Sequence, residues 1–320
     1  MEELNKREKE LFISYGSAAS EAMFDFPCHF FQIPTSTGFI AYRIQFTCAI
    51  ILGDPICQVD ERMALMQAFH QYCNKLNMRI VYISVSATYA KMLQKDCKVL
   101  MEVCEEIFFD PQINPLIANH RLEHRFNKAI QHGLTFHEYI PLNQEIENSL
   151  LEIGVKWNKA IKGSHVYIGH LNFFESYIGK RWFYVKDGTQ IISMIMLSKL
   201  EAQGGWYLKF LITLPKVFRE TSEFAMVSLL KTLRNENCRF LTKGMIPLDC
   251  MGEIKGLSFF SNQFINYIYK IIGFIFKFKK RKAYWQRYHP KSVPTYLAFS
   301  NSKIGLNEIR ALMNVFKMKL

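Results

Sequence analysis

The sequence predicts an α/β protein, of the α+β kind, that is built from two similar modules. The order strand, strand, helix, strand occurs once in each half of the chain. In the first half, the sequence Gly53-Asp54-Pro55 ends the strand pair abruptly. Of the 320 residues, 49% are hydrophobic and 14% aromatic. The chain can therefore bury a full core, which excludes a disordered protein.

The first module is expected within residues 1–135. Two β-branched and aromatic runs, Phe39–Ile44 and Ala49–Leu52, predict a pair of strands. Asp54 lies in the turn that follows, where an aspartate typically holds the turn or caps the next helix, so we expect a structural role. Apolar residues at helical spacing predict a helix over Glu61–Leu76, and Arg79–Val85 has the composition of a strand.

The second module is expected within residues 136–320. Its strands are predicted at Gln190–Leu197, Trp206–Ile212 and Cys238–Thr242, with a Gly204-Gly205 turn between the first two. Thr221 and Ser222 are candidate N-caps of a helix that runs to about Arg234.

Two further helices are predicted between these repeats. The first covers residues 116–132, places four basic residues on one side and ends at Gly133, a typical C′ residue. The second runs over about Gln144–Ile161. The segment between them, Leu134–Leu142, is the expected domain boundary.

The formal net charge of +12 favours an anionic partner: nucleic acid, an acidic membrane or phosphate groups. The basic and apolar segment 264–290 contains an apolar run, Phe264–Phe278, and six basic residues within Phe276–Arg287. Such a segment can lie in a lipid interface, at about 1 kcal/mol for each cation near an anionic leaflet. The competing interpretation is a solvated strand or loop beside a buried helix, Phe264–Ile275.

The eight cysteines form no C-x-x-C pair and lie mostly in apolar runs, which indicates reduced, buried thiols in a cytosolic protein. Clustered Cys and His at ligand spacing are missing, so no metal site is expected. The charged N-terminus is unlike a secretory signal, and no apolar run reaches the roughly 18 residues of a membrane-spanning helix. A glycine-rich loop suited to acetyl-CoA is also missing before both predicted module helices.

Several motifs together carry a family resemblance. They are GFIAYR (Gly38–Arg43), LGDPIC (Leu52–Cys57), RLEHRFNKAIQHG (Arg121–Gly133), KGMIPLD (Lys243–Asp249), FKFKKRKAYWQRYHP (Phe276–Pro290) and PTYLAF (Pro294–Phe299). In this order, from about Tyr15 to Phe299, the chain resembles the C-terminal synthase domain of phosphatidylglycerol lysyltransferases, also called multiple peptide resistance factors.

The resemblance implies two tandem GNAT-like acyltransferase modules with mixed central sheets. It implies a bacterial enzyme of lipid metabolism that moves an amino acid, lysine or a similar one, from aminoacyl-tRNA to the headgroup hydroxyl of phosphatidylglycerol or a related lipid. Aminoacyl-tRNA is then the co-substrate, and no cofactor is expected. The protein would be cytoplasmic and peripheral at the inner face of an anionic membrane, with a separate flippase as a further expected partner.

The resemblance also implies roles for particular residues. The expected catalytic residues, lining the transfer cleft, are Lys209, Lys243, Asp249 and Tyr284. The expected ligands of tRNA or lipid phosphates are Arg121, Arg125, Lys128, Lys279, Arg281, Lys282 and Arg287. Asp249 follows a predicted strand, which suits a proton acceptor, although a turn is the commoner place for such an aspartate.

Three positions depart from the family pattern. Lys209 is the one charged residue in a strand where the family carries an acid and an arginine, and Trp285 replaces the first lysine of the Y-K-x-K-F-x-P motif. His165, after Lys162, stands where the family has an acidic residue. Two alternatives therefore stand beside the transferase: a protein of the same fold that binds membranes or nucleic acid without catalysis, and an aminoacyltransferase that acts on amine acceptors.

Overall fold

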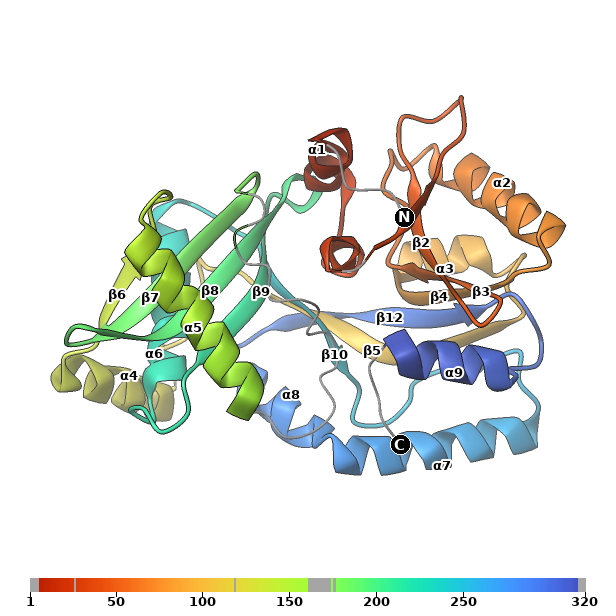
Figure 1. Ribbon diagram of the computed structural model, residues 1–320. Coiled ribbons are helices and arrows are strands. Elements are labelled where there is room, and N and C mark those ends of the chain that lie inside the picture. The colour runs from red at the N-terminus through yellow and green to blue at the C-terminus, as the bar shows by residue number, and fades with distance from the viewer. Residues whose placement is uncertain (1–5, 26, 118, 161–173, 175–176, 316–320) are drawn as a thin grey trace.

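The computed structural model describes residues 6–25, 27–117, 119–160, 174 and 177–315. Within this part of the chain, a 12-stranded mixed sheet runs through the whole molecule (Figure 1). The path along it is β1-β2-β3-β4-β12-β5-β10-β9-β8-β7-β6, and β11 pairs with β5 beside this path. The predicted mixed α/β class is confirmed.

The helices are α1 (Lys6–Tyr15), α2 (Arg62–Lys75), α3 (Ala87–Leu93), α4 (His120–His132), α5 (Gln144–Ala160), α6 (Thr221–Asn235), α7 (Phe259–Ile275), α8 (Phe278–Gln286) and α9 (Leu306–Val315), with 3₁₀ turns η1 (Ser20–Phe24) and η2 (Glu201–Gln203). The strands are β1 (His29–Phe31), β2 (Ile40–Gln45), β3 (Cys48–Leu52), β4 (Arg79–Ser86), β5 (Val99–Phe109), β6 (Thr135–Glu138), β7 (Lys180–Asp187), β8 (Gln190–Leu200), β9 (Gly205–Thr213), β10 (Leu241–Pro247), β11 (Ile254–Lys255) and β12 (Lys291–Phe299).

The predicted repeat is confirmed in both order and pairing. In the first half, β2 and β3 are antiparallel, and α2 connects β3 to the parallel strand β4. In the second half, β8 and β9 are antiparallel, and α6 connects β9 to the parallel strand β10. The chain therefore contains two copies of one supersecondary unit, as expected for tandem GNAT-like modules.

The two halves share strands. The last strand, β12, lies between β4 and β5, and β5 in turn pairs with β10 of the second half. In addition, α4 packs on α6, since Leu122 and Ala129 belong to the core of the second half. The boundary expected near residue 135 thus cuts across one continuous sheet and core.

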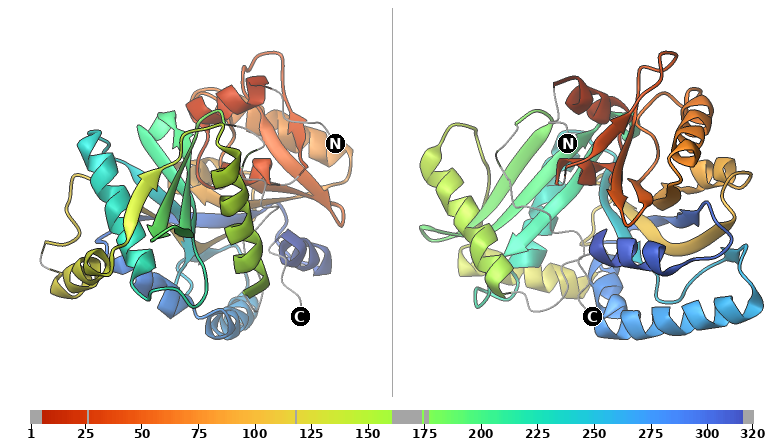
Figure 2. Two further views of the ribbon diagram at one scale, coloured as in Figure 1. Left: turned by 60° about the vertical axis from the view of Figure 1, so that its left-hand side comes forward. Right: turned by 45° about the vertical axis from the view of Figure 1, so that its right-hand side comes forward.

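Helices cover both faces of each half (Figures 1 and 2). In the first half, α2 and α3 cover one face, and α9 with part of α7 covers the other. In the second half, α4, α6 and α8 cover one face, and α5 covers the other. Alternation along β7 explains this, because Phe183 and Val185 face α6 while Trp182 and Tyr184 face α5.

Three local expectations are wrong. Glu220, not Thr221 or Ser222, precedes the first residue of α6, and the Thr221 hydroxyl instead donates to the carbonyl of Phe218 within the turn. The strand expected at Cys238–Thr242 begins three residues later, at Leu241, because the preceding residues close the turn after α6. Cys250 is exposed rather than buried, since it lies in the loop beyond β10.

The segment 264–290 forms helices rather than a strand or loop, and the competing interpretation of a buried helix is wrong. None of the residues of α7 is buried, and many of its large apolar side chains are exposed. Among the described residues, no helix combines the length and apolar character needed to cross a bilayer.

Candidate active site

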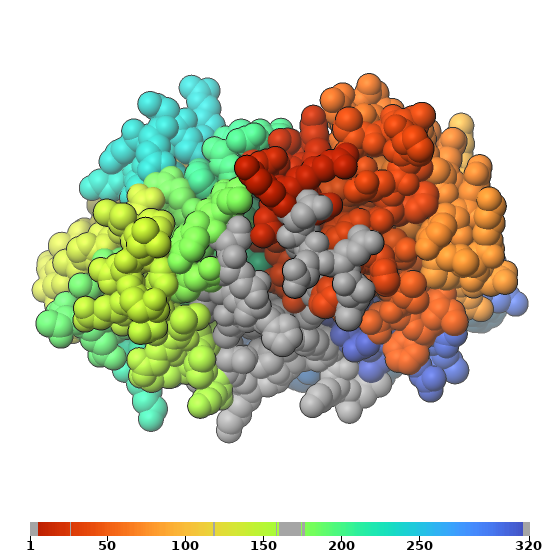
Figure 3. Space-filling model, turned by 45° about the horizontal axis from the view of Figure 1, so that its top comes forward, coloured from red at the N-terminus to blue at the C-terminus, as the bar shows by residue number. Residues whose placement is uncertain are grey.

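A buried cluster of ion pairs joins the N-terminal segment to the second half. We call Glu21, Asp25, Lys180 and Lys209 the N-terminal cluster. Glu21 Oε1 lies 2.6 Å from Lys180 Nζ, and Glu21 Oε2 lies 2.8 Å from Lys209 Nζ. Asp25 Oδ1 lies 2.7 Å from the same Lys209 amine, and Lys180 Nζ also donates to Ser198 Oγ at 2.5 Å. Figure 3 shows the N-terminal segment lying against both halves on one face of the molecule.

The Gly53-Asp54-Pro55 turn allows this segment to approach. Gly53 has φ +77°, and a Cβ atom there would lie 2.9 Å from the backbone nitrogen of Ser20 at the start of η1. Only glycine allows this backbone conformation and this contact without strain. Asp54 accepts hydrogen bonds from the backbone N–H and the hydroxyl of Ser86, the N-cap of α3, which confirms its structural role.

Charges within the N-terminal cluster compensate one another. Burial opposes the charged form of Glu21, but the ammonium groups of Lys180 and Lys209 outweigh it and lower the pKa of the Glu21 carboxyl. Burial opposes the charge on Lys209 as well, but Glu21 and Asp25 outweigh burial, so the pKa of Lys209 is raised. Asp25 is less well compensated, and burial raises its pKa to about 6. The cluster therefore keeps buried groups of opposite charge paired where the N-terminal segment contacts the second half.

Lys243 lies on β10 next to this cluster. Its Nζ donates to the backbone carbonyls of Leu208, at 3.0 Å, and Lys209, at 3.2 Å. The same amine lies 5.8 Å from the ring centroid of Tyr207 and 5.9 Å from that of Trp285. Burial lowers the pKa of Lys243 to about 8. Its amine is thus partly neutral near physiological pH, as a proton acceptor requires.

A carboxylic acid from the first half lies beside the same strand. Glu106 on β5 accepts a hydrogen bond from the hydroxyl of Thr242, at 2.8 Å. Burial raises the pKa of Glu106, although this hydrogen bond acts in the opposite direction. Gly244, with φ +78°, follows directly after Lys243, and a Cβ atom there would approach the Tyr207 ring to 3.0 Å. The bulge around Lys243 therefore fits closely against Tyr207.

A second cluster, called the helix cluster, consists of Arg125, Glu223 and Arg287. Glu223 on α6 is buried and forms ion pairs with Arg125 of α4 and with Arg287 after α8, the latter at 2.5 Å. Tyr284 shares a hydrogen bond with the hydroxyl of Ser222, and the Arg287 guanidinium lies 4.9 Å from the Tyr284 ring. Burial raises the pKa of Tyr284, so its hydroxyl stays protonated.

The aromatic ring of Trp285 lies near both Lys243, beside the N-terminal cluster, and Tyr284, beside the helix cluster. It lies 4.9 Å, centroid to centroid, from Tyr284 and 5.9 Å from Lys243 Nζ. The structure thus connects Lys243 to Tyr284 through this ring, with the backbone carbonyl of Lys209 hydrogen-bonded to Lys243. Tyr284 in turn adjoins Arg287, which belongs to the helix cluster with Arg125.

Other predicted residues lie outside this group. Asp249 is exposed in the loop after β10. β10 pairs with β9 only at its first two residues, Leu241 and Thr242. Asp249 therefore lies beyond the end of β10 that is remote from β9. On α4, Arg121 is exposed, and Lys128 is 54% exposed and lies 3.9 Å from Glu220.

The basic residues of α8 are divided in the same way. Lys279 and Arg281 are exposed, whereas Lys282 forms an ion pair with Glu105 of β5 at 2.7 Å. Lys162 and His165, the latter being one of the positions where the chain departs from the family pattern, lie outside the described residues.

The sequence prediction missed several charged residues of the site: Glu21, Asp25, Lys180, Glu106 and Glu223. Glu223 could have been found as the single carboxylate of the predicted helix, directly before the mostly apolar stretch Phe224–Leu230. Glu21 and Lys180 are 159 positions apart, and no sequence pattern pairs them.

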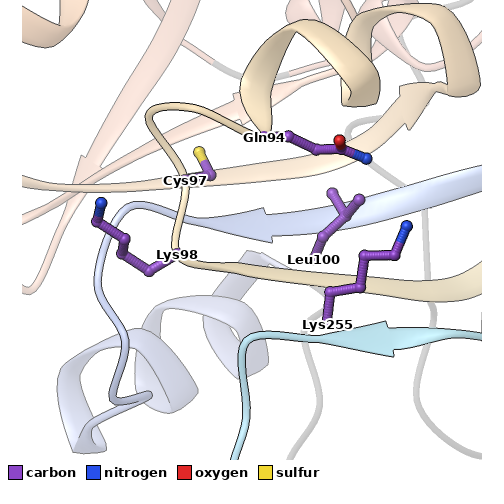
Figure 4. Close-up of a pocket in the computed structure, with 5 residues that line it drawn as sticks. All are labelled: Gln94, Cys97, Lys98, Leu100 and Lys255. Carbon is purple, nitrogen blue, oxygen red and sulfur yellow. The ribbon is translucent and has the colours of Figure 1, made fainter.

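One cavity of the described residues lies away from this site. It measures about 220 Å³ and is lined by Gln94, Cys97, Lys98, Leu100 and Lys255 (Figure 4). None of the predicted site residues lines it, and burial raises the pKa of Cys97 to about 12, which keeps the thiol unreactive. No group of three or more possible metal ligands occurs in the described part of the chain.

Comparison with known proteins identifies relatives across nearly the whole chain. The family model described as "Phosphatidylglycerol lysyltransferase, C-terminal" matches residues 10–299. A phosphatidylglycerol lysyltransferase of Staphylococcus aureus (strain COL) is 19% identical over 318 residues, which cover 97% of this chain and 37% of that protein. The chain therefore spans little more than a third of the length of this relative.

Solved structures show the same fold. The structure of L-PGS from Bacillus licheniformis has a TM-score of 0.80 at 16% identity, and the match covers 99% of this chain and 98% of that one. The C-terminal domain, DUF2156, of a protein named as a lysylphosphatidylglycerol synthetase from Agrobacterium fabrum has a TM-score of 0.79 at 18% identity, covering 96% and 94%.

Proposed function

Because the chain belongs to the family of phosphatidylglycerol lysyltransferase C-terminal domains, we propose that it is an aminoacyltransferase that acts on phosphatidylglycerol or a related lipid. The observation that carries this proposal is the family match over residues 10–299, which includes both repeats and both charged clusters. The amino acid, lysine or a similar one, comes from aminoacyl-tRNA, and no other cofactor takes part.

The proposed reaction needs little covalent chemistry from the protein. A hydroxyl oxygen of the lipid headgroup attacks the ester carbonyl of aminoacyl-tRNA, a new ester forms, and the ribose oxygen of the tRNA leaves with a proton. The Lys243 amine, with its pKa lowered to about 8, accepts the proton of the attacking hydroxyl. Tyr284 and Arg287 stabilise the negative charge that develops on the carbonyl oxygen.

Exposed cations provide contacts for the two polyanionic substrates. Arg121 and Lys128 on α4 contact tRNA phosphates, and Lys279 and Arg281 on α8 contact lipid or tRNA phosphates. The protein acts at the cytoplasmic face of the membrane as a peripheral protein, and a separate flippase would move the product across the bilayer.

A direct assay tests this proposal. Purified protein is incubated with phosphatidylglycerol vesicles and tRNA charged with a radiolabelled amino acid, and the label is counted in the chloroform-extractable lipid. We expect transfer with lysyl-tRNA or a related aminoacyl-tRNA, and loss of transfer when the tRNA is deacylated first. No transfer with any common amino acid and any anionic lipid would refute the proposal. Transfer to amines but not to lipids would show that the acceptor is an amine.

The second candidate function is that of a binding protein without catalysis. The observation in its favour is Lys209, whose buried amine forms ion pairs with Glu21 and Asp25 in a strand where the resemblance implies catalytic charges. Binding of vesicles and tRNA without labelled lipid product would support this second function.

A further inference from the structure

Helix α7 is apolar on two opposite sides. One side faces the protein: Ile265 packs in the core of the first half, and the Tyr269 hydroxyl lies within hydrogen-bond distance of the carbonyl oxygens of Val103, at 2.7 Å, and Leu248, at 2.8 Å. A surface helix that packs by one side normally carries polar residues on the other. In α7 the other side is apolar as well.

The outward side of α7 forms a continuous stripe at spacings of three and four residues. We call these residues the outer stripe: Phe260, Phe264, Tyr267, Ile268, Ile271, Phe274 and Ile275. The exposed fraction reaches 83% at Phe260 and 87% at Phe274. With 17 residues, the helix is about 25 Å long, so the stripe is larger than the scattered apolar residues of an ordinary surface.

Exposed cations lie at the C-terminal end of the outer stripe. The chain turns at Lys277, which has φ +54°, and α8 begins at the next residue. Lys277, Lys279, Lys280 and Arg281 are all exposed. Helix α7 runs along the lower edge of the molecule in Figure 1, with α8 continuing from its end, and it lies at the lower edge in both views of Figure 2.

We propose that the outer stripe of α7 inserts into the interfacial zone of an anionic phospholipid bilayer, with the exposed cations of α8 on headgroup phosphates. An interfacial helix typically combines an apolar side rich in Phe, Leu and Ile with nearby Lys and Arg. An RNA would contact the cations but leave the stripe in water. The proposal rests on the proposed function, and it adds which surface brings the protein to its lipid substrate.

Vesicle flotation with the full chain tests the proposal. Wild-type protein is mixed with vesicles of phosphatidylglycerol and phosphatidylcholine, or of phosphatidylcholine alone, and the bound fraction is measured. We expect binding to the anionic vesicles, and about a tenfold loss of the partition coefficient for the double variant F264S/F274S. The double variant K279Q/K280Q should lose about thirtyfold, since each of the two cations near an anionic leaflet contributes ~1 kcal/mol.

A matched control uses apolar residues that are equally exposed outside α7. Val59 and Ile140 are 63% and 79% exposed, and V59S/I140S should bind vesicles like the wild type. Circular dichroism and the thermal midpoint check that all variants are folded. Unchanged vesicle binding by F264S/F274S would overturn the proposal. A second outcome would also overturn it: the wild type is a dimer, and F264S/F274S is a monomer that binds vesicles as the wild type does. In that case the outer stripe contacts a second copy of the chain.

Transfer to a short-chain phosphatidylglycerol dissolved below its micelle concentration separates this proposal from the proposed function. If the protein is a transferase that docks through α7, F264S/F274S keeps transfer to the dissolved lipid and loses transfer to vesicles. If the wild type binds vesicles through the stripe but transfers to neither form of lipid, the docking surface stands and the proposed function fails.

Discussion

At the scale of single residues, Lys243 owes its chemistry to its backbone partners. Its amine donates to two carbonyl groups of β9 and lies between the rings of Tyr207 and Trp285. Carbonyl groups and aromatic faces satisfy the amine without providing a carboxylate partner for its charge. Burial therefore lowers its pKa to about 8, unlike that of Lys209, which is raised between two carboxylates.

The pH dependence of transfer tests the role of Lys243. Because its pKa in the folded protein is lowered, the neutral amine becomes the main form as the pH rises through about 8, and the rate should rise over the same range. An arginine stays protonated, so K243R should lose about 10²- to 10⁴-fold in rate, and K243M should lose as much. The control K231R, at an exposed position of α6, should keep both the rate and its pH profile. A K243R enzyme with the wild-type pH profile would contradict the role.

The N-terminal cluster is expected to stabilise the fold through Lys209. K209M leaves Asp25 and one oxygen of Glu21 buried without their cation, and such a loss costs about 3 kcal/mol of the free energy of unfolding. The exposed pair of Lys156 and Glu152 provides the control, and K156M should cost less than about 0.5 kcal/mol. Urea unfolding followed by fluorescence measures both. Equal losses of unfolding free energy for K209M and K156M would mean that the buried ion pairs stabilise the fold no more than an exposed pair does.

At the scale of elements, one carboxylate fixes three helical segments. Glu223 of α6 contacts Arg125 of α4 and Arg287 at the end of α8. The Phe126 and Phe224 rings stack at 5.5 Å between α4 and α6, so packing and charge act on the same contact. The helix cluster therefore sets where α8, with Tyr284 and Trp285, lies on the second half.

The variant E223Q tests this arrangement. The amide keeps the shape of the side chain but removes the charge that two partly buried guanidinium groups share, so we expect a loss of about 3 kcal/mol in unfolding free energy. Hydrogen exchange should also become faster in α4 and α8, which the carboxylate holds against α6. E152Q, on the exposed side of α5, is the control and should change neither quantity. Unaltered exchange in both helices would show that apolar packing alone positions them.

At the scale of the whole molecule, strand exchange makes the two halves one folding unit. β12 completes the sheet of the first half, although it follows the whole second repeat in the chain, and β5 pairs across to β10. Arg79 at the start of β4 and Glu308 of α9, 229 positions apart, form an ion pair within the first half. Neither half can form its native sheet without strands or helices from the other.

Calorimetry tests this unity. We expect one unfolding transition with equal calorimetric and van't Hoff enthalpies, because no sheet edge separates the halves. Fragments 1–135 and 136–320 should not fold alone, since the first lacks β12 and the second lacks β5 and α4. Mixing the fragments should restore structure by circular dichroism. Two separate transitions, or a folded fragment 1–135, would contradict this expectation.

Local features of the molecule could be predicted from the sequence. Paired strands, the α2 and α4 helices, and the left-handed Gly133 at the end of α4 depend on periodicity and turn chemistry between near neighbours. The repeated strand, strand, helix, strand order followed from the same local patterns. Of the candidate site, Lys243 and Tyr284 could be named because they belong to motifs that resemble a known family.

The sequence by itself determined the repeated elements, their order and the family of this protein. Only the tertiary structure decided that β12 enters the first half, that Lys209 pairs with Glu21 and Asp25, and that the outer side of α7 is left uncovered. The physical reason is the range of the interactions. Helical and strand periodicity reflect contacts within a few residues, whereas ion pairs and sheet order depend on how distant segments pack, and no local pattern encodes that packing.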